Sequence, residues 1–290
     1  MSNVELKPFK RPSMWRRMSL ANWRAPADPQ VYGRMELDMT NALAYAEEAG
    51  AAAGVRITPT HLVVRAVAGA LRRHPGNNVM IRWNRVYERE TVDVFCQVAI
   101  PGKNDLSGAV IRNADTKDAA AISKELKGRA AQVREGSDEL SQSRGLLDRI
   151  PAFLYRFILG LLSFLQYTLN LNLKPLGLPK DAFGSVMVTS IGSLGIPEGW
   201  APLVPMSRVP IVLSVGALQD RPWVVDGKIE IRPISVVSAV FDHRIMDGLN
   251  AGRLAQELQD YLADPAKWEA GLPDGSPDAA VPVALATHIN

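Results

Sequence analysis

The alternation of apolar and polar positions divides this chain into strands and helices. Spacing and end signals predict helices over 41–53, 58–75, 118–135 and 250–262. β-branched or alternating runs predict strands at 31–38, 79–83, 85–87, 92–100, 108–111, 185–190, 210–218, 224–225, 229–233 and 234–241. Strands interleaved with helices in this way indicate an α/β protein.

The stretch 234–262 combines a strand, a polar turn and a helix. Its first part, 234–241, is β-branched and apolar, and apolar residues from Asn250 onward follow helical spacing. Between them lies Asp-His-Arg-Ile-Met-Asp-Gly, residues 242–248. Because α/β proteins place functional residues in the loops at strand ends, we predict that this titratable cluster is the active site.

The segment 147–178 has a very high density of apolar residues and is predicted to form an extra helix. Its polar or small positions are three, four or seven residues apart, which places them on one narrow helical stripe. These positions are Arg149, Arg156, Gly160, Ser163, Tyr167, Asn170 and Lys174. The wide apolar arc that remains is compatible with packing against protein, with a membrane interface and with a membrane span. Internal Arg156, Gln166 and Asn170 argue against the span.

Charge and cysteine content exclude several classes of protein. The formal net charge is only +3, which gives no electrostatic case for nucleic-acid binding. Cys96 is the only cysteine, so no disulfide can form within the chain. The four histidines also lie far apart, so the sequence has no zinc-ligand spacing and no metal site is expected. The first residues lack an apolar signal core, and a cytoplasmic protein is therefore expected.

His243, Asp247 and Gly248 form the pattern His-x-x-x-Asp-Gly. Three other segments fall around it in a recognisable order: HLVVRAVAGALRRHPGNN at 61–78, VTSIGSLGI at 188–196 and VPIVLSVGALQDRPWVVDGKIEIRP at 209–233. Together they resemble the chloramphenicol acetyltransferase-like acyltransferases, above all the catalytic domain of the dihydrolipoamide acyltransferase of 2-oxoacid dehydrogenase complexes. The resemblance covers about residues 10–140 and 183–265. It implies a two-layer α+β sandwich with helices flanking a mixed sheet.

The resemblance also implies a reaction and a set of site residues. A thiol of coenzyme A or dihydrolipoamide exchanges an acyl group, and His243 is the candidate base because a neutral imidazole can accept the thiol proton. Thr189 is the expected donor to the oxyanion, or Ser190 if the alignment slips by one residue. Asp247 is expected to organise the site through a pair with an arginine, for which Arg16 is a candidate. Coenzyme A enters as a substrate.

The resemblance further implies a homotrimer, with the base and the oxyanion donor supplied by different chains, and larger assemblies built from trimers. No lipoyl domain is recognised, so a lipoyl group is expected on another chain, with 2-oxoacid dehydrogenase components as partners. The expected organisation is an arm over 1–24, a catalytic domain over 25–265 that contains the 147–178 helix, and a loosely ordered tail over 266–290. The alternative is a non-catalytic scaffold trimer that uses 147–178 for assembly or membrane docking.

Overall fold

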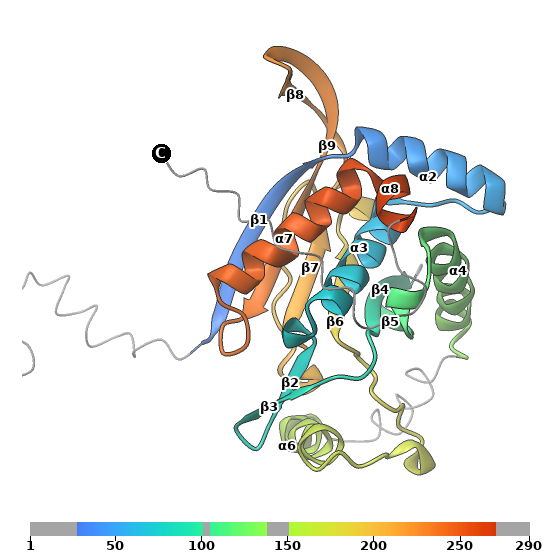
Figure 1. Ribbon diagram of the computed structural model, residues 1–290. Helices are drawn as coiled ribbons and strands as arrows, with labels where there is room; N and C mark the ends of the chain where they lie inside the picture. Colours follow the sequence, from blue (N-terminus) through green and yellow to red (C-terminus); the bar gives the residue numbers. More distant parts are fainter. Residues whose placement is uncertain (1–27, 101–104, 138–150, 271–290) are drawn as a thin grey trace, which may run out of the picture.

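The computed structural model describes residues 28–100, 105–137 and 151–270, so the expected arm with Arg16 and most of the expected tail lie outside the description. Within these ranges, seven strands form one sheet in the order β1-β9-β7-β6-β4-β5, with β8 paired to β9 (Figure 1). The strands are β1 (Gln30–Asp38), β4 (Val94–Ile100), β5 (Asp105–Ile111), β6 (Val186–Ser190), β7 (Ile211–Val215), β8 (Gln219–Val225) and β9 (Lys228–Asp242). Strand β6 is parallel to β4 and β7, whereas the other pairs are antiparallel. The mixed sheet predicted from the sequence is thus confirmed.

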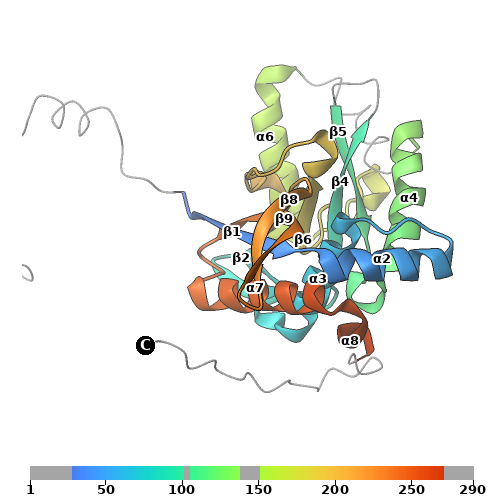
Figure 2. The same cartoon turned by 90° about the horizontal axis from the view of Figure 1, so that it is seen from above.

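Helices cover one face of this sheet, and the main core lies between the two layers (Figure 2). These helices are α2 (Thr40–Ala53), α3 (Pro59–Arg73), α4 (Ala119–Glu135), α7 (Gly248–Ala263) and α8 (Pro265–Ala270). Every residue of α3 from Leu62 to Leu71 is buried, including Arg65. Short 3-10 turns occur at 75–77, 114–116, 174–176, 192–194 and 205–207. The two-layer α+β arrangement agrees with the prediction.

Turn residues form two hairpins where the sequence predicts them. Strands β2 (Val79–Arg82) and β3 (Arg85–Glu88) make a separate two-stranded sheet, joined by Trp83 and Asn84, which both have positive φ. Asp226 and Gly227 also take positive φ and connect β8 to β9. Two consecutive left-handed residues match the right-handed twist of a hairpin.

Helix α8 begins at Pro265 and covers the first residues, 266–270, of the predicted loosely ordered tail. Its Glu269 accepts hydrogen bonds of 2.9 Å from Nε and Nη2 of buried Arg65, and its Trp268 ring packs edge-on against Tyr261. The Trp268 ring also occupies the space beside Gly69, where a Cβ atom would come within 2.0 Å of it. These contacts hold the end of the described chain against α3 and α7.

The continuous helix predicted over about 147–178 is not confirmed. Helix α6 (Ala152–Ser163) continues through a π-helical turn over Phe164–Thr168 and then ends. Asn170 takes a left-handed backbone conformation with φ of 59°, which is a common way for a helix to terminate. No described helix is long and apolar enough to cross a membrane.

Candidate functional site

The turn that carries His243 is held in place by backbone hydrogen bonds and one buried side chain. Strand β9 ends at Asp242, and the N–H of His243 donates to the carbonyl of Pro29, 2.8 Å away, beside the start of β1. The N–H groups of Ile245 and Met246 both donate to the carbonyl of Asp242, and Met246 is buried. The His243 side chain is exposed. The fold therefore presents an accessible imidazole on a well-anchored backbone.

Asp242 and Arg244, which flank the histidine, form an ion pair across the turn. Arg244 donates from Nε and Nη2 to the buried carboxylate of Asp242, with a shortest distance of 2.5 Å. Burial raises the pKa of Asp242, but the hydrogen bonds and charge of Arg244 outweigh burial and hold this pKa below its usual value. Sequence reasoning did not assign these two residues a role, although both lie inside the motif.

Asp247 begins helix α7 rather than contacting His243. Its side chain accepts a hydrogen bond of 2.8 Å from the N–H of Asn250, which is the bond expected of an aspartate at an N-cap. Arg16, the arginine suggested as the partner of Asp247, lies outside the described residues. The capping bond fixes the direction in which the helix leaves the motif.

Thr189 lies near the end of β6, and its side chain contacts a neighbouring strand. Because Cys96 of β4 is opposite Val188 of β6 in the parallel register, the next residues, Gln97 and Thr189, lie side by side. The Thr189 hydroxyl donates to Oε1 of Gln97, 2.7 Å away. No pattern in the sequence identifies Gln97 as a site residue, because its contact with Thr189 depends on the pairing of β4 with β6. Ser190 is also partly exposed at this strand end.

His243 and Thr189 lie at opposite ends of the sheet in one chain. Strand β9 runs antiparallel to β7, and β7 runs parallel to β6, so the end of β9 is beside the start of β6. The register aligns Thr189 with Ser214 and Ser214 with Ser238, five residues before His243. With about 3.3 Å per residue and about 4.8 Å per strand, the two residues are on the order of 20 Å apart. They cannot act on one carbonyl group within a single chain.

A cavity of about 220 Å³ adjoins the motif turn. Asp242, Arg244 and Ile245 line it on one side, and the segment 203–205 with Arg208 and Val209 lines another. The remaining lining residues are Asp28, Pro29, Gln30 and Ile81. The turn is therefore beside a small cavity that is open to solvent.

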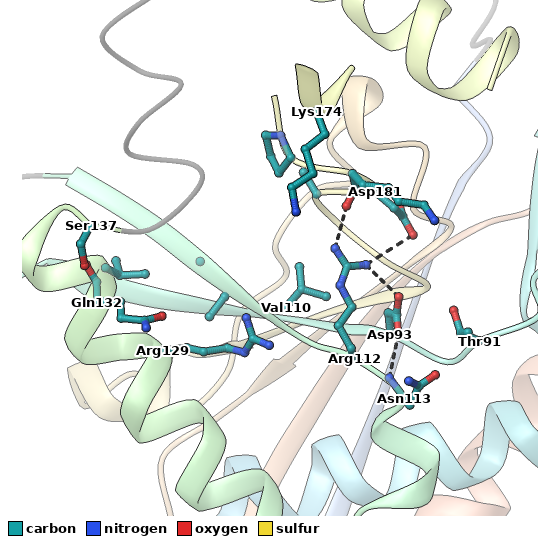
Figure 3. A pocket seen from close by; sticks show the side chains of 16 residues that line it. Thr91, Asp93, Val110, Arg112, Asn113, Arg129, Gln132, Ser137, Lys174 and Asp181 are labelled. Atoms are coloured by element: carbon teal, nitrogen blue, oxygen red, sulfur yellow. Dashed lines mark hydrogen bonds and ion pairs between the residues drawn. The ribbon is translucent and has the colours of Figure 1, made fainter. Parts of the chain in front are cut away.

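A larger cavity of about 730 Å³ lies near the outer strand β5, between α4 and the segment 174–182 (Figure 3). None of the predicted site residues lines it. Its Arg112 pairs with Asp93 at 2.8 Å, and the carbonyl of Lys180 accepts a hydrogen bond from the same guanidinium. Arg129, on α4, pairs with Glu125 at 2.8 Å. The resemblance assigns no site residue to this cavity, so the motif turn remains the better candidate for the predicted acyl transfer.

Comparison with known proteins agrees with the fold and with the family that the sequence resembles. The family model described as 2-oxoacid dehydrogenases acyltransferase (catalytic domain) matches residues 2–146 and 179–270. The acetyltransferase component of the pyruvate dehydrogenase complex from Zymomonas mobilis is 22% identical and matches 82% of this chain. The lipoamide acyltransferase component of the branched-chain alpha-keto acid dehydrogenase complex from Bacillus subtilis is 26% identical and matches 81%.

A solved structure has the same fold. Dihydrolipoamide acetyltransferase from Azotobacter vinelandii superposes with a TM-score of 0.60 at 23% identity, covering 86% of this chain and 85% of that one. The chain spans less than half the length of the two relatives above, 45% and 46%. Since the family model matches most of the sequence on both sides of 147–178, the chain belongs to the family of 2-oxoacid dehydrogenase acyltransferase catalytic domains.

Proposed function

We propose that this protein moves an acyl group between coenzyme A and a thiol such as dihydrolipoamide. The observation that carries the proposal is the accessible His243 on a turn anchored by Pro29, Asp242 and Met246, in a chain of this family. Investigations of the Azotobacter vinelandii enzyme concern the role of a serine, a histidine and an asparagine in its catalytic mechanism. That histidine and asparagine are four residues apart, as are His243 and Asp247.

In the proposed reaction, the imidazole of His243 accepts the proton of the attacking thiol. The sulfur then forms a bond to the thioester carbonyl carbon, and the carbonyl oxygen becomes an oxyanion. The Thr189 hydroxyl has one proton, which turns from Oε1 of Gln97 to this oxyanion and donates a hydrogen bond to it. A fixed donor of this kind is worth about 10²–10³ in rate. When the tetrahedral intermediate collapses, the bond to the first sulfur breaks and the leaving thiolate takes the proton from His243.

The separation between His243 and Thr189 supports a site formed between two chains. Because the two residues lie at opposite ends of one sheet, we place His243 of one protomer against Thr189 of its neighbour in a homotrimer. Asp247 in this arrangement organises the site by capping α7 and by pairing with an arginine. Trimers could then associate further into a larger core.

The proposed partners follow from the same chemistry. The catalytic domain, residues 25–265, would act in the cytoplasm with 2-oxoacid dehydrogenase components, and the lipoyl group would be carried on another chain. Coenzyme A and its acyl thioester would be substrates. A non-catalytic scaffold trimer is the competing function, and it predicts no turnover with any acceptor.

The test is transfer from acetyl-coenzyme A to dihydrolipoamide, and in parallel to a small amine, by the wild-type protein and by His243→Ala. We expect coenzyme A release that depends on dihydrolipoamide and is lost in the variant. Turnover with the amine alone would show that the acceptor is an amine and not a thiol. Absence of turnover with either acceptor, or equal turnover in the variant, would contradict the proposal.

A further inference from the structure

Helix α6 exposes an unusual amount of apolar surface. Leu154, Phe157, Leu161 and Phe164 recur three or four residues apart, so they lie on one helical face, and all four are exposed, Phe157 to 69%. The polar side chains Ser163 and Tyr167 are instead buried against the protein. A surface helix normally has the opposite arrangement. The family model does not match this part of the chain, so α6 is a feature beyond the common catalytic fold.

The buried side of α6 is fixed to the protein by polar contacts. Arg208 donates from Nε to the Ser163 hydroxyl, 3.1 Å away, and Gln166 donates from its side-chain amide to the carbonyl of Pro179, 3.2 Å away. Turning the apolar face inward would break both bonds and expose these groups. These two hydrogen bonds therefore fix the rotation of the helix that leaves Phe157 and Leu161 exposed.

The hairpin β2–β3 extends the apolar surface beyond the helix. Trp83, at its turn, is 59% exposed and packs edge-on against Phe164, with ring centroids 5.8 Å apart. Figure 1 shows α6 and this hairpin close together at the edge of the molecule away from α2. We call Leu154, Phe157, Leu161, Phe164 and Trp83 the apolar stripe. Exposed clusters of this kind mark surfaces that bind a partner or a membrane.

Charge and length indicate which partner covers the stripe. Residues 149–180 contain four basic residues, Arg149, Arg156, Lys174 and Lys180, and the nearest acidic residues are Asp148 and Asp181 at the two ends of this range. Helix α6 has 12 residues, or about 18 Å, and is too short for a hydrocarbon core of about 30 Å. A short helix with leucine and aromatic residues on one face, in a basic segment, is typical of the interface of an anionic membrane.

We propose that the apolar stripe docks this protein on the surface of a bilayer that contains anionic lipid, with α6 parallel to the membrane plane. Arg208, which holds Ser163 of α6, also lines the cavity beside the His243 turn. Docking would thus bring that cavity near the lipid surface. The proposal depends on the exposed face of α6 and does not depend on acyl transfer.

The experiment is flotation of the full-length protein with vesicles of phosphatidylcholine, with or without phosphatidylglycerol, and measurement of its mass in solution. The test variant is Phe157→Ser with Leu161→Ser. The matched control is Val224→Ser with Ile229→Ser, which removes two equally apolar side chains, 69% and 77% exposed, from the distant β8–β9 hairpin. Unfolding temperature confirms that each variant is folded.

We expect wild type and control to float with the anionic vesicles, and this binding should weaken at high salt. The stripe variant should bind the vesicles at least about tenfold more weakly, and its mass in solution should equal that of wild type. Equal flotation of wild type and stripe variant, or no flotation of wild type, would overturn the proposal. A reduced mass of the stripe variant would also overturn it, because the stripe would then be an interface between copies of this chain. Equal binding of wild type to neutral vesicles would contradict the requirement for anionic lipid.

Discussion

The two ends of the central sheet are built in different ways. At one end, the turn 242–247 is held by backbone hydrogen bonds to Pro29 and Asp242 and by the buried Met246. At the other end, the Thr189 hydroxyl is partly exposed and is oriented by a single side chain, Gln97. The difference indicates that the backbone around His243 is fixed within one chain, whereas the orientation of the Thr189 hydroxyl depends on one side-chain contact. Substitutions at the two ends should therefore have different consequences.

The largest expected effect is at His243. His243→Ala removes the proposed base, and because such a base contributes about 10²–10⁴ in rate, we expect kcat to fall by that factor with the unfolding temperature unchanged. The measurement is steady-state transfer from acetyl-coenzyme A to dihydrolipoamide. His74→Gln is the matched control, since His74 interacts with Glu257 at 3.3 Å and has no place in the proposed site. An equal loss in both variants would argue against a specific role for His243.

At the other end of the sheet, Thr189→Ala should lower kcat by about 10²–10³ because the oxyanion loses its side-chain donor. Thr189→Ser keeps a hydroxyl and should recover much of the rate. Ser190→Ala distinguishes the neighbouring residue and should stay within about twofold of wild type. If Ser190→Ala is the slow variant and Thr189→Ala is not, the oxyanion donor is one residue further along β6.

Substitution of Gln97 tests whether its contact with Thr189 orients the Thr189 hydroxyl. Gln97→Leu removes the contact that positions the Thr189 side chain before the oxyanion forms, so we expect kcat to fall about tenfold through loss of orientation, with little change in KM for the acyl donor. Gln97→Glu places a carboxylate beside the oxyanion and holds the Thr189 proton more strongly, so it should be at least as slow as Gln97→Leu. A fall in KM and kcat together, or a loss of folding in both variants, would indicate that Gln97 has a structural role only.

The smallest effect is expected at Asp242, where backbone bonds already hold the turn. The pKa of this carboxyl is held below its usual value by Arg244, so the ionised form stabilises the fold above about pH 4, and this contribution disappears as pH falls through the lowered pKa. Because Arg244 is largely exposed, Asp242→Asn should lower Tm by only about 2–4 °C at pH 7. The difference should shrink at pH 3. A constant difference at both pH values would show that charge is not its cause.

Helices α7 and α6 show how far the apolar pattern predicts structure. In α7 the pattern and the packing agree, because Leu254, Leu258, Tyr261 and Leu262 are buried where their helical spacing predicts. In α6 and the turn after it, Ser163 and Tyr167 of the predicted polar stripe are buried, whereas Gly160 of the same stripe and the apolar Phe157 and Leu161 are exposed. A pattern shows which residues share a face, whereas what covers the face depends on tertiary contacts such as Arg208 with Ser163.

The same distinction applies to the candidate site. The motif 242–248 is continuous in sequence, and its turn and the helix after it could therefore be predicted. The contact between Gln97 and Thr189 joins residues 92 positions apart and requires the parallel pairing of β4 with β6. The ion pair of Asp242 with Arg244 is local, yet its geometry depends on the turn that brings residues two positions apart into contact.

If His243 and Thr189 act from different chains, mixing two inactive variants should restore activity. His243→Ala and Thr189→Ala proteins would be unfolded together in equal amounts, refolded and assayed for acetyl transfer to dihydrolipoamide, with each variant refolded alone as control. In randomly mixed trimers about one quarter of the sites receive both intact residues, so we predict about one quarter of the activity of refolded wild type. Activity no higher than that of the separate variants, in trimers shown to contain both chains, would contradict this arrangement.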